Sequence, residues 1–357
     1  MKSAQLQTKY RAAPAAALLV VSPIIVEVLF GATHMSMLYL LIPQLCIYGG
    51  AALIIRTLAR QRGWKAILFL GIAFAIAEEC VILQTSVSPI LFGGDPVHIY
   101  SWWLDVNWVY LLWAVVYESI WAIVLPIQLV ELIFPDQRDN PWVARRGLVI
   151  TAVLFLLASI AVWYRFTQVG IIPGKAYEAP IPLVMITFAV IATLGVATLA
   201  PRKPTYRVKV AAHSVPSPRL VGVLSFGLAL PWFILAILAY VGPASLPAFI
   251  PVTIGLGWAF TSLFLISRWS SNPEWQDSHR LALIAGALIA SMLAGFLIVG
   301  PTLSPFDLIG KLTLNVNAVM LLVYLARKIQ RRTESANAQP QPAVSPHALT
   351  LLHKKLQ

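Results

Sequence analysis

The sequence predicts an all-α fold, an integral membrane bundle of about ten transmembrane helices with both termini in the cytoplasm. Hydrophobic residues make up 59% of the 357 residues and charged residues only 11%, whereas soluble domains carry about 25% charged residues. Apolar runs long enough to cross a bilayer, about 20 residues each, recur along the whole chain. The basic residues gather in alternate loops, which is typical of a chain that crosses a membrane repeatedly.

The apolar runs define the predicted helices in order. Each run is expected to be helical, because lipid offers no hydrogen-bond partner to a backbone amide. Prolines inside several runs are compatible with this, since membrane helices tolerate them as kinks. The ten predicted spans are residues 12–32, 36–56, 66–87, 107–134, 147–166, 180–200, 219–241, 247–267, 280–300 and 306–326.

The distribution of positive charge predicts the orientation. There are 26 Lys and Arg against 14 Asp and Glu, a formal charge of +12. With the N-terminus inside, 23 of the 26 fall in cytoplasmic loops and tails, and only Arg165, Lys175 and Lys311 fall outside. This asymmetry explains the basic surplus without a nucleic-acid partner. The expected partners are the lipid bilayer and, at the basic inner face, anionic lipids.

The chain is predicted to form one domain. Residues 1–332 make a single transmembrane domain, with a polar, acidic half at 1–146 and an apolar half at 147–332. Residues 333–357 are of low complexity and are predicted to be a disordered cytoplasmic tail.

Neither a cofactor nor a metal is expected. Cys46 and Cys80 both lie in apolar runs and are interpreted as small buried hydrophobes. The sequence contains no CxxC, HExxH, P-loop or GxGxxG pattern. Any transport would therefore be secondary or powered by a partner protein. Composition and spacing leave the oligomeric state open.

Carboxylates inside the spans are the candidate functional groups, because a charged group in a bilayer is costly and usually marks a site. Glu118 lies about 16 Å from the outer start of its helix, near the midplane. Glu78 and Glu79 point about 100° apart, so only one of them is expected to face a shared cavity. Glu27 and Glu131 lie near helix ends, where they are expected to reach water or headgroups.

Asparagines are the candidate polar partners. Asn107 shares one stripe of its helix with Glu118, and Asn315 and Asn317 reach a similar depth on the last helix. The residues predicted to bind an ion or a substrate are Glu118, Glu78, Glu79, Asn107 and Asn317.

Five stretches between about residues 18 and 150 carry a first resemblance. They are LLVVSPIIVEVLFG, YGGAALIIRTLARQRGW, GIAFAIAEECVILQ, DVNWVYLLW and VLPIQLVELIFP. Together they resemble a family of polytopic bacterial membrane proteins of uncharacterised activity. The resemblance implies a multi-pass protein of the bacterial plasma membrane and no particular reaction.

A second resemblance rests on two residues. The pair Glu78-Glu79 resembles the start of EExxxR, the first motif of the CAAX-type prenyl-protease and bacteriocin-processing membrane protease family. Leu83 stands at the arginine position of that motif, and none of the six histidines lies within a span. The resemblance implies an intramembrane protease with the glutamate pair as base. The predicted spans lack the histidines that such an enzyme needs.

Three functions remain open at this level. The first is a secondary transporter or permease of a small solute or cation that uses intramembrane carboxylates. The second is a membrane-embedded enzyme that acts on a lipid or a peptide. The third is a non-catalytic membrane subunit. The sequence does not decide whether the protein is an enzyme or what its substrate is.

Overall fold

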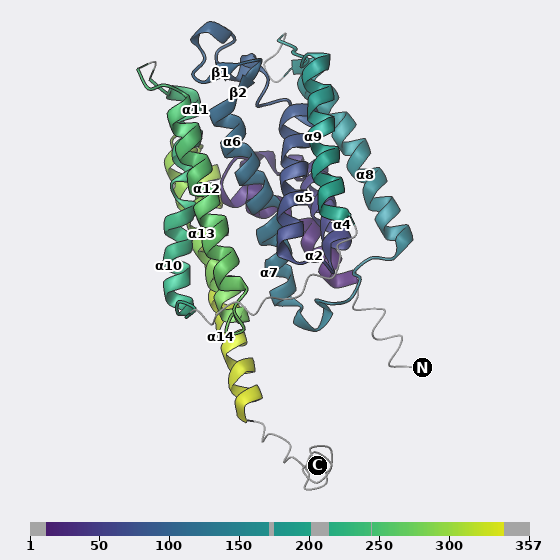
Figure 1. Cartoon of the computed structure of the whole chain (residues 1–357), viewed down its shortest axis with the longest axis vertical. Helices are drawn as coiled ribbons and strands as arrows, with labels where there is room; N and C mark the ends of the chain where they lie inside the picture. The colour runs from purple at the N-terminus through teal and green to yellow at the C-terminus, as the bar shows by residue number, and fades with distance from the viewer. Residues whose placement is uncertain (1–11, 171–174, 201–213, 244, 339–357) are drawn as a thin grey trace, which may run out of the picture.

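The computed structural model describes residues 12–170, 175–200, 214–243 and 245–338. The described chain is almost entirely helical, with two strands of two residues each. The helices run up and down the long axis of one bundle, as Figure 1 shows. The predicted all-α class is confirmed.

The first half of the chain supplies the centre of the bundle and its interrupted helices. Several of its helices contain π-helical turns. The label η is used both for these turns and for the 3₁₀ segments. The elements are α2 (Ala12–Pro23), η1 (Ile24–Leu29), η2 (Met35–Leu40), α3 (Leu41–Gln44), η3 (Leu45–Gly49), α4 (Gly50–Ala59), α5 (Trp64–Ala77), η4 (Glu78–Ile82), η5 (Pro89–Phe92), η6 (Pro96–His98), β1 (Trp102–Trp103), β2 (Val106–Asn107), α6 (Trp108–Tyr117), η7 (Glu118–Val124), α7 (Leu125–Ile133) and η8 (Pro135–Gln137). β1 pairs antiparallel with β2, with Trp102 opposite Asn107.

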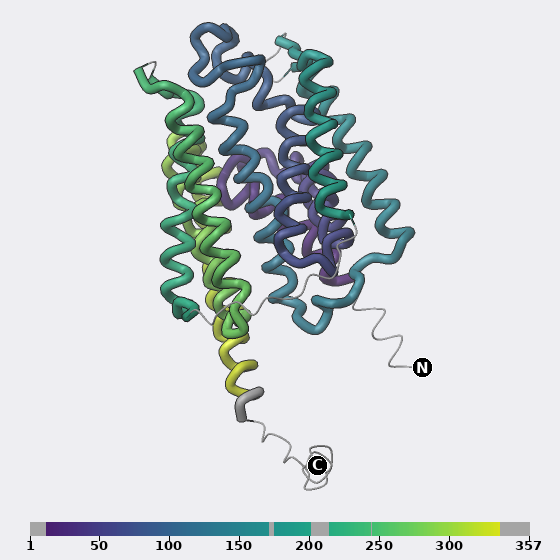
Figure 2. The backbone as a smooth tube through the Cα atoms, in the orientation of Figure 1, coloured from purple at the N-terminus to yellow at the C-terminus, as the bar shows by residue number. Residues whose placement is uncertain are grey.

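The second half supplies longer and more regular helices. They are α8 (Arg145–Tyr164) with η9 (Arg165–Gly170), α9 (Ile181–Leu199), α10 (Pro218–Ala229), α11 (Trp232–Val241), α12 (Phe249–Ser270), α13 (Asp277–Ile298), η10 (Gly300–Thr302) and α14 (Pro305–Ala338). The tube in Figure 2 shows α10 to α14 gathered on one side of the bundle and α8 and α9 on the other.

The described residues include nine helices that are long and apolar enough to cross a membrane. These nine correspond to nine of the ten predicted spans. The remaining prediction, 66–87, corresponds to the helix formed by α5 and η4. That helix carries the charged residues Lys65, Glu78 and Glu79 close to its ends.

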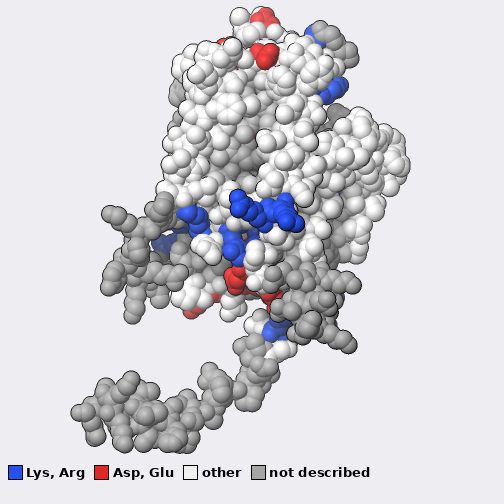
Figure 3. Space-filling view, turned by 90° about the vertical axis from the view of Figure 1, so that its right-hand side faces the viewer, with Lys and Arg blue, Asp and Glu red and all other residues white. Residues whose placement is uncertain are grey.

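Burial separates central helices from peripheral ones. At least half of the apolar stretch is buried in the first helix, in the helix from α6 to α7, and in α13. In α8, α9 and α12 only 6%, 11% and 11% of the stretch is buried. Large apolar side chains that face outward are expected where the surrounding solvent is lipid. On the face in Figure 3 the broad middle band carries no charge, and Lys and Arg gather toward one end.

The predicted tail begins later than expected. Helix α14 continues through residue 333 and ends at Ala338, so residues 333–338 are helical. Arg327, Lys328, Arg331 and Arg332 give this stretch helix-forming side chains beyond the apolar run. The remainder of the predicted disordered tail, 339–357, lies outside the described residues.

Candidate functional site

Three glutamates and one tyrosine from four different helices converge inside the bundle. Each of them lies in a π-helical turn: Glu27 in η1, Tyr48 in η3, Glu78 in η4 and Glu118 in η7. A π-turn places one extra residue in the helix and displaces the backbone hydrogen bonds, and such turns occur preferentially at functional sites. We call Glu27, Tyr48, Glu78 and Glu118 the carboxyl network.

The outer part of the network is held by hydroxyl and amide donors. The Tyr48 hydroxyl donates to Glu27 Oε1 at 3.0 Å, and the Thr33 hydroxyl donates to Glu27 Oε2 at 2.8 Å. Gln44 Nε2 in turn donates to Thr33 Oγ1 at 2.8 Å. The chain can make these contacts because it turns sharply after Phe30 and returns as η2 and α3. Glu27, which the sequence placed near a helix end, is half-buried and is hydrogen-bonded within the network.

The inner part of the network is a pair of carboxyl groups. Glu78 is 1% exposed and Glu118 is 7% exposed. Glu78 lies close to both the Tyr48 hydroxyl and the Glu118 carboxyl. Oε2 of each glutamate is buried and receives no hydrogen bond from the described part of the chain. A hydrogen bond between two carboxyl groups requires that one of them holds a proton.

The network contains no compensating positive charge. Within the described ranges, none of the ion pairs involves Glu27, Glu78 or Glu118. In the same ranges no three His, Cys, Asp or Glu side chains are arranged to hold a metal ion. The chemistry that fits such a set is the gain and loss of protons, because neutralisation by a proton needs no ligand geometry.

Glu79 belongs to a separate cluster. Its Oε2 accepts hydrogen bonds from the hydroxyls of Thr85 and Ser86, the latter at 2.7 Å. Both hydroxyls lie in the turn that follows η4, and Ser86 O accepts from the Asn107 backbone at 2.9 Å. Neighbouring residues on a helix diverge by about 100°, which accounts for the separation of Glu79 from Glu78.

Asn107 has a structural position far from Glu118. It is fully buried and caps the start of α6, with Oδ1 accepting from the Tyr110 backbone at 3.1 Å and from the Ser101 hydroxyl at 2.7 Å. Its Nδ2 donates to Ala239 O on α11 at 3.3 Å. Asn107 thus joins the loop before α6 to two helices. It shares a helix stripe with Glu118 but lies three turns from it.

Asn317 does not face the site. Its side chain is exposed on the outer surface of α14, whereas Asn315 is 6% exposed. Both polar atoms of the Asn315 amide are buried without a hydrogen-bond partner in the described part of the chain. Residues two positions apart on a helix point in nearly opposite directions, so the interior asparagine of this helix is Asn315.

Other charged groups of the spans have polar partners near the ends of the bundle. Glu131 accepts from Arg280 at 3.1 Å and lies 3.7 Å from Arg56. Lys311, expected outside, is 3% exposed and donates to the carbonyls of Leu29 and Phe30 at 2.6 and 2.7 Å. It therefore satisfies carbonyls that the end of η1 leaves without helical partners.

Tyr48, Thr33 and Gln44 are the site residues that the search for carboxylates missed. A tyrosine followed by two glycines in the middle of an apolar run was the available signal, because a buried phenol needs a hydrogen-bond partner. A second tyrosine, Tyr117, donates to Val26 O at 2.6 Å and so ties the turn that carries Glu118 to the turn that carries Glu27.

Comparison with known proteins adds no assignment: no model of a protein family, no curated protein and no solved structure matches this chain.

Removal of the Asn107 side chain tests its structural position. Asn107→Ala should lower the free energy of unfolding by about 1–2 kcal/mol, since it deletes a helix cap that is also buried. Denaturant titration of the purified protein in detergent measures the change. Asn317→Ala is the matched control and should stay within about 0.5 kcal/mol of wild type, because its side chain is exposed. Equal losses from the two variants would contradict the structural position of Asn107.

Proposed function

We propose that the protein is a ten-span protein of the bacterial plasma membrane with both ends in the cytoplasm. The start of α2 and the end of α14 lie toward the same end of the bundle (Figure 1), which requires an even number of crossings. The helix of α5 and η4 supplies the tenth crossing beside the nine apolar ones. The 23 to 3 division of basic residues supports the orientation.

Reporter fusions test this topology. Reporters placed after residues 95 and 175 should give an outside signal, and those after residues 62, 140 and 335 an inside signal. Residue 95 is decisive, because it follows the helix of α5 and η4. A cytoplasmic signal there would remove that crossing and place the carboxyl network differently.

We further propose that the protein is a proton-coupled secondary transporter. The observation that carries this proposal is the placement of η7. Glu118 at its start belongs to the carboxyl network, while Ser119, Ile120 and Trp121 line a large cleft on its other side. One helical turn thus carries both a carboxyl group that can gain and lose a proton and side chains that line the cleft.

The coupling step follows from charge repulsion. With one proton between them, Glu78 and Glu118 share a hydrogen bond. When the proton leaves, two carboxylates face each other without a cation, and like charges at such distances repel strongly in an apolar interior. Relief of this repulsion requires η4 and η7 to separate. Movement of η7 shifts Ser119 and Trp121 and so changes the width of the cleft.

The two halves that such a movement would rock lie on either side of the cleft. One wall comes from α5 and from the helix of α6, η7 and α7, and the other from α10, α12 and α13. Alternating access in secondary transporters is largely the rocking of one bundle against another around a fixed site. The first four spans, which hold all members of the carboxyl network, would move against the rest.

The protease alternative has weaker support in the geometry. Glu78 and Glu79 point into different clusters, so they do not form one catalytic pair. Within the described residues, neither glutamate makes a hydrogen bond with a histidine. A non-catalytic subunit would make no use of a carboxyl group beside a cleft, and no observation favours it over transport.

The test is proton movement that depends on a solute. The purified protein is reconstituted in liposomes that contain a pH-sensitive dye, and candidate solutes, short-chain anionic lipids among them, are added outside. Transport predicts that one of them changes the internal pH in protein-containing liposomes and not in empty ones. Absence of any change across the panel, in protein shown to be folded, would contradict the proposal.

A further inference from the structure

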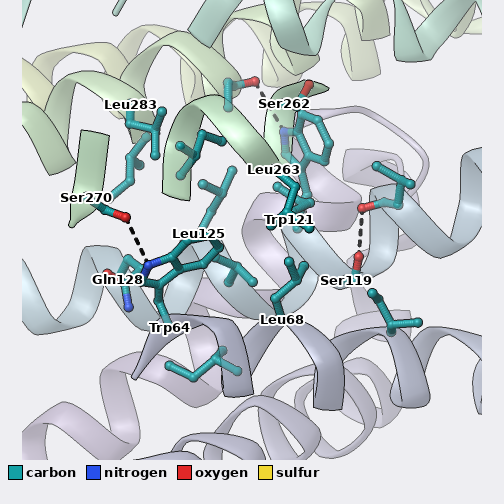
Figure 4. Close-up of a pocket in the computed structure, with 18 of the residues that line it drawn as sticks. Trp64, Leu68, Ser119, Trp121, Leu125, Gln128, Ser262, Leu263, Ser270 and Leu283 are labelled. Carbon is teal, nitrogen blue, oxygen red and sulfur yellow. Dashed lines mark hydrogen bonds between the residues drawn. The ribbon is translucent and has the colours of Figure 1, made fainter. Parts of the chain in front are cut away.

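A long cleft of about 690 Å³ separates the two helix groups. This volume lies within the range of about 300–1,000 Å³ that is usual for ligand pockets. Figure 4 shows Leu68, Leu125, Leu263 and Leu283 directed into the space from opposite walls. Trp64, at the start of α5, donates to the Ser270 hydroxyl at the end of α12 at 3.2 Å and so connects the two walls (Figure 4).

The cleft is apolar over most of its length. On the helix of α6, η7 and α7 its lining extends from Leu112 to Glu131, roughly 28 Å along the axis. That length approaches the hydrocarbon thickness of a bilayer, about 30 Å. Phe69 and Phe260, which also line it, are exposed on the outer surface of the bundle. The cleft therefore opens sideways, where the surrounding solvent is lipid.

Arginines occupy one end of the cleft. Arg56, Arg60, Arg138 and Arg280 line it there, together with the carboxylates of Glu131 and Asp139. Asp277 lies behind this group and pairs with Arg138 at 2.9 Å. Four positive charges thus meet three negative ones, so the cluster retains an excess of positive charge.

One arginine nitrogen at this end lacks a partner. Nε of Arg138 is buried and makes no hydrogen bond within the described residues, whereas Nε of Arg56 lies 3.7 Å from Glu131 Oε1. Arg56 as a whole is 1% exposed, and its other nitrogens donate to the carbonyls of Asn140 and Arg138. A buried donor without an acceptor is costly. An anionic group in the cleft would supply the missing acceptor to Arg138 Nε.

We propose that the cleft binds a membrane lipid with an anionic headgroup, with the headgroup at the arginine end and an acyl chain along the apolar walls. A small soluble anion would use the arginines but leave most of the cleft empty. A neutral lipid would fill the walls but leave the positive charge uncompensated. The claim that this lipid is the transported substrate rests on the proposed function. The claim that the lipid binds in the cleft is tested by binding alone.

The charge of the headgroup is tested with two lipids of the same chains. Purified protein is titrated with dioleoylphosphatidylglycerol and with dioleoylphosphatidylcholine in detergent, and bound lipid is counted by native mass spectrometry. The anionic lipid should bind at least tenfold more tightly. Arg60→Gln and Arg138→Gln should each weaken its binding about tenfold, the change expected when one charge-assisted hydrogen bond is lost.

Controls separate the cleft from general surface charge. Arg146→Gln alters an exposed arginine outside the cleft lining and should leave binding unchanged. Leu263→Trp fills the cleft and should weaken both lipids. Three results would each overturn the proposal. They are equal binding of the two lipids, competition by inorganic phosphate as strong as by lipid, and wild-type binding by Leu263→Trp. Specific lipid binding without proton movement would retain this inference and reject transport.

Discussion

Glu118→Gln is expected to give a folded protein that no longer moves protons with its solute. Glutamine keeps the size and hydrogen-bonding capacity of the side chain, so the contact with Glu78 can persist. Interhelical hydrogen bonds of this kind contribute about 0.6 kcal/mol on average, and stability should change by no more than that. The variant cannot release a proton, so the repulsion between Glu78 and Glu118 never arises. Solute-dependent proton movement in liposomes should fall to the level of empty liposomes.

The neighbouring glutamates supply the comparison. Glu78→Gln should abolish proton movement as Glu118→Gln does, because either change removes one half of the pair. Glu79→Gln should retain it, because the Glu79 carboxyl is bound by Thr85 and Ser86 outside the network. Wild-type proton movement by Glu118→Gln would remove Glu118 from the mechanism. Equal effects of Glu78→Gln and Glu79→Gln would contradict a single network.

The helices could be predicted from sequence because the bilayer sets their length. Runs of about 20 apolar residues have one stable conformation in lipid, and the predicted spans agree with the observed helices to within a few residues at most ends. The largest extension is α14, which continues to Ala338 on charged residues that need no lipid. Depth along a helix could also be predicted from the rise per residue, as it was for Glu118.

Direction around a helix was predicted less well than depth along it. In the span with Asn315 and Asn317, the polar residues Asp307, Lys311 and Asn315 recur every four residues and are all buried. This stripe was the available signal that Asn315 is the asparagine that faces inward. Glu27 was misjudged because the chain returns after Phe30 and brings Thr33 and Gln44 back to it. The π-turns leave no periodic signal in short apolar runs. The cleft arises where α5 faces α12, about 190 residues apart, and no local pattern reports such a contact.

The close approach of α2 and η3 positions the network and makes a second strong prediction. At Gly49, next to Tyr48, an added Cβ would lie 2.3 Å from the backbone oxygen of Leu19 and 2.7 Å from its Cα. Backbone atoms cannot move aside as the end of a side chain can. Gly49→Ala must therefore push η3 away from α2, and overpacking of this kind costs about 1–3 kcal/mol.

The adjacent glycine is the matched control for this prediction. A Cβ at Gly50 would meet Phe155 Cβ at 3.6 Å, an ordinary contact. Gly50→Ala should then be neutral or stabilising, because alanine favours a helix over glycine by up to about 1 kcal/mol. Gly49→Ala carries the same propensity gain, so a net loss can come only from the contact between the helices. Because displaced η3 also moves the Tyr48 hydroxyl away from Glu27 and Glu78, Gly49→Ala should impair proton movement as well as stability. If denaturant titration gave Gly49→Ala and Gly50→Ala the same free energy of unfolding, α2 and η3 would not pack at this distance.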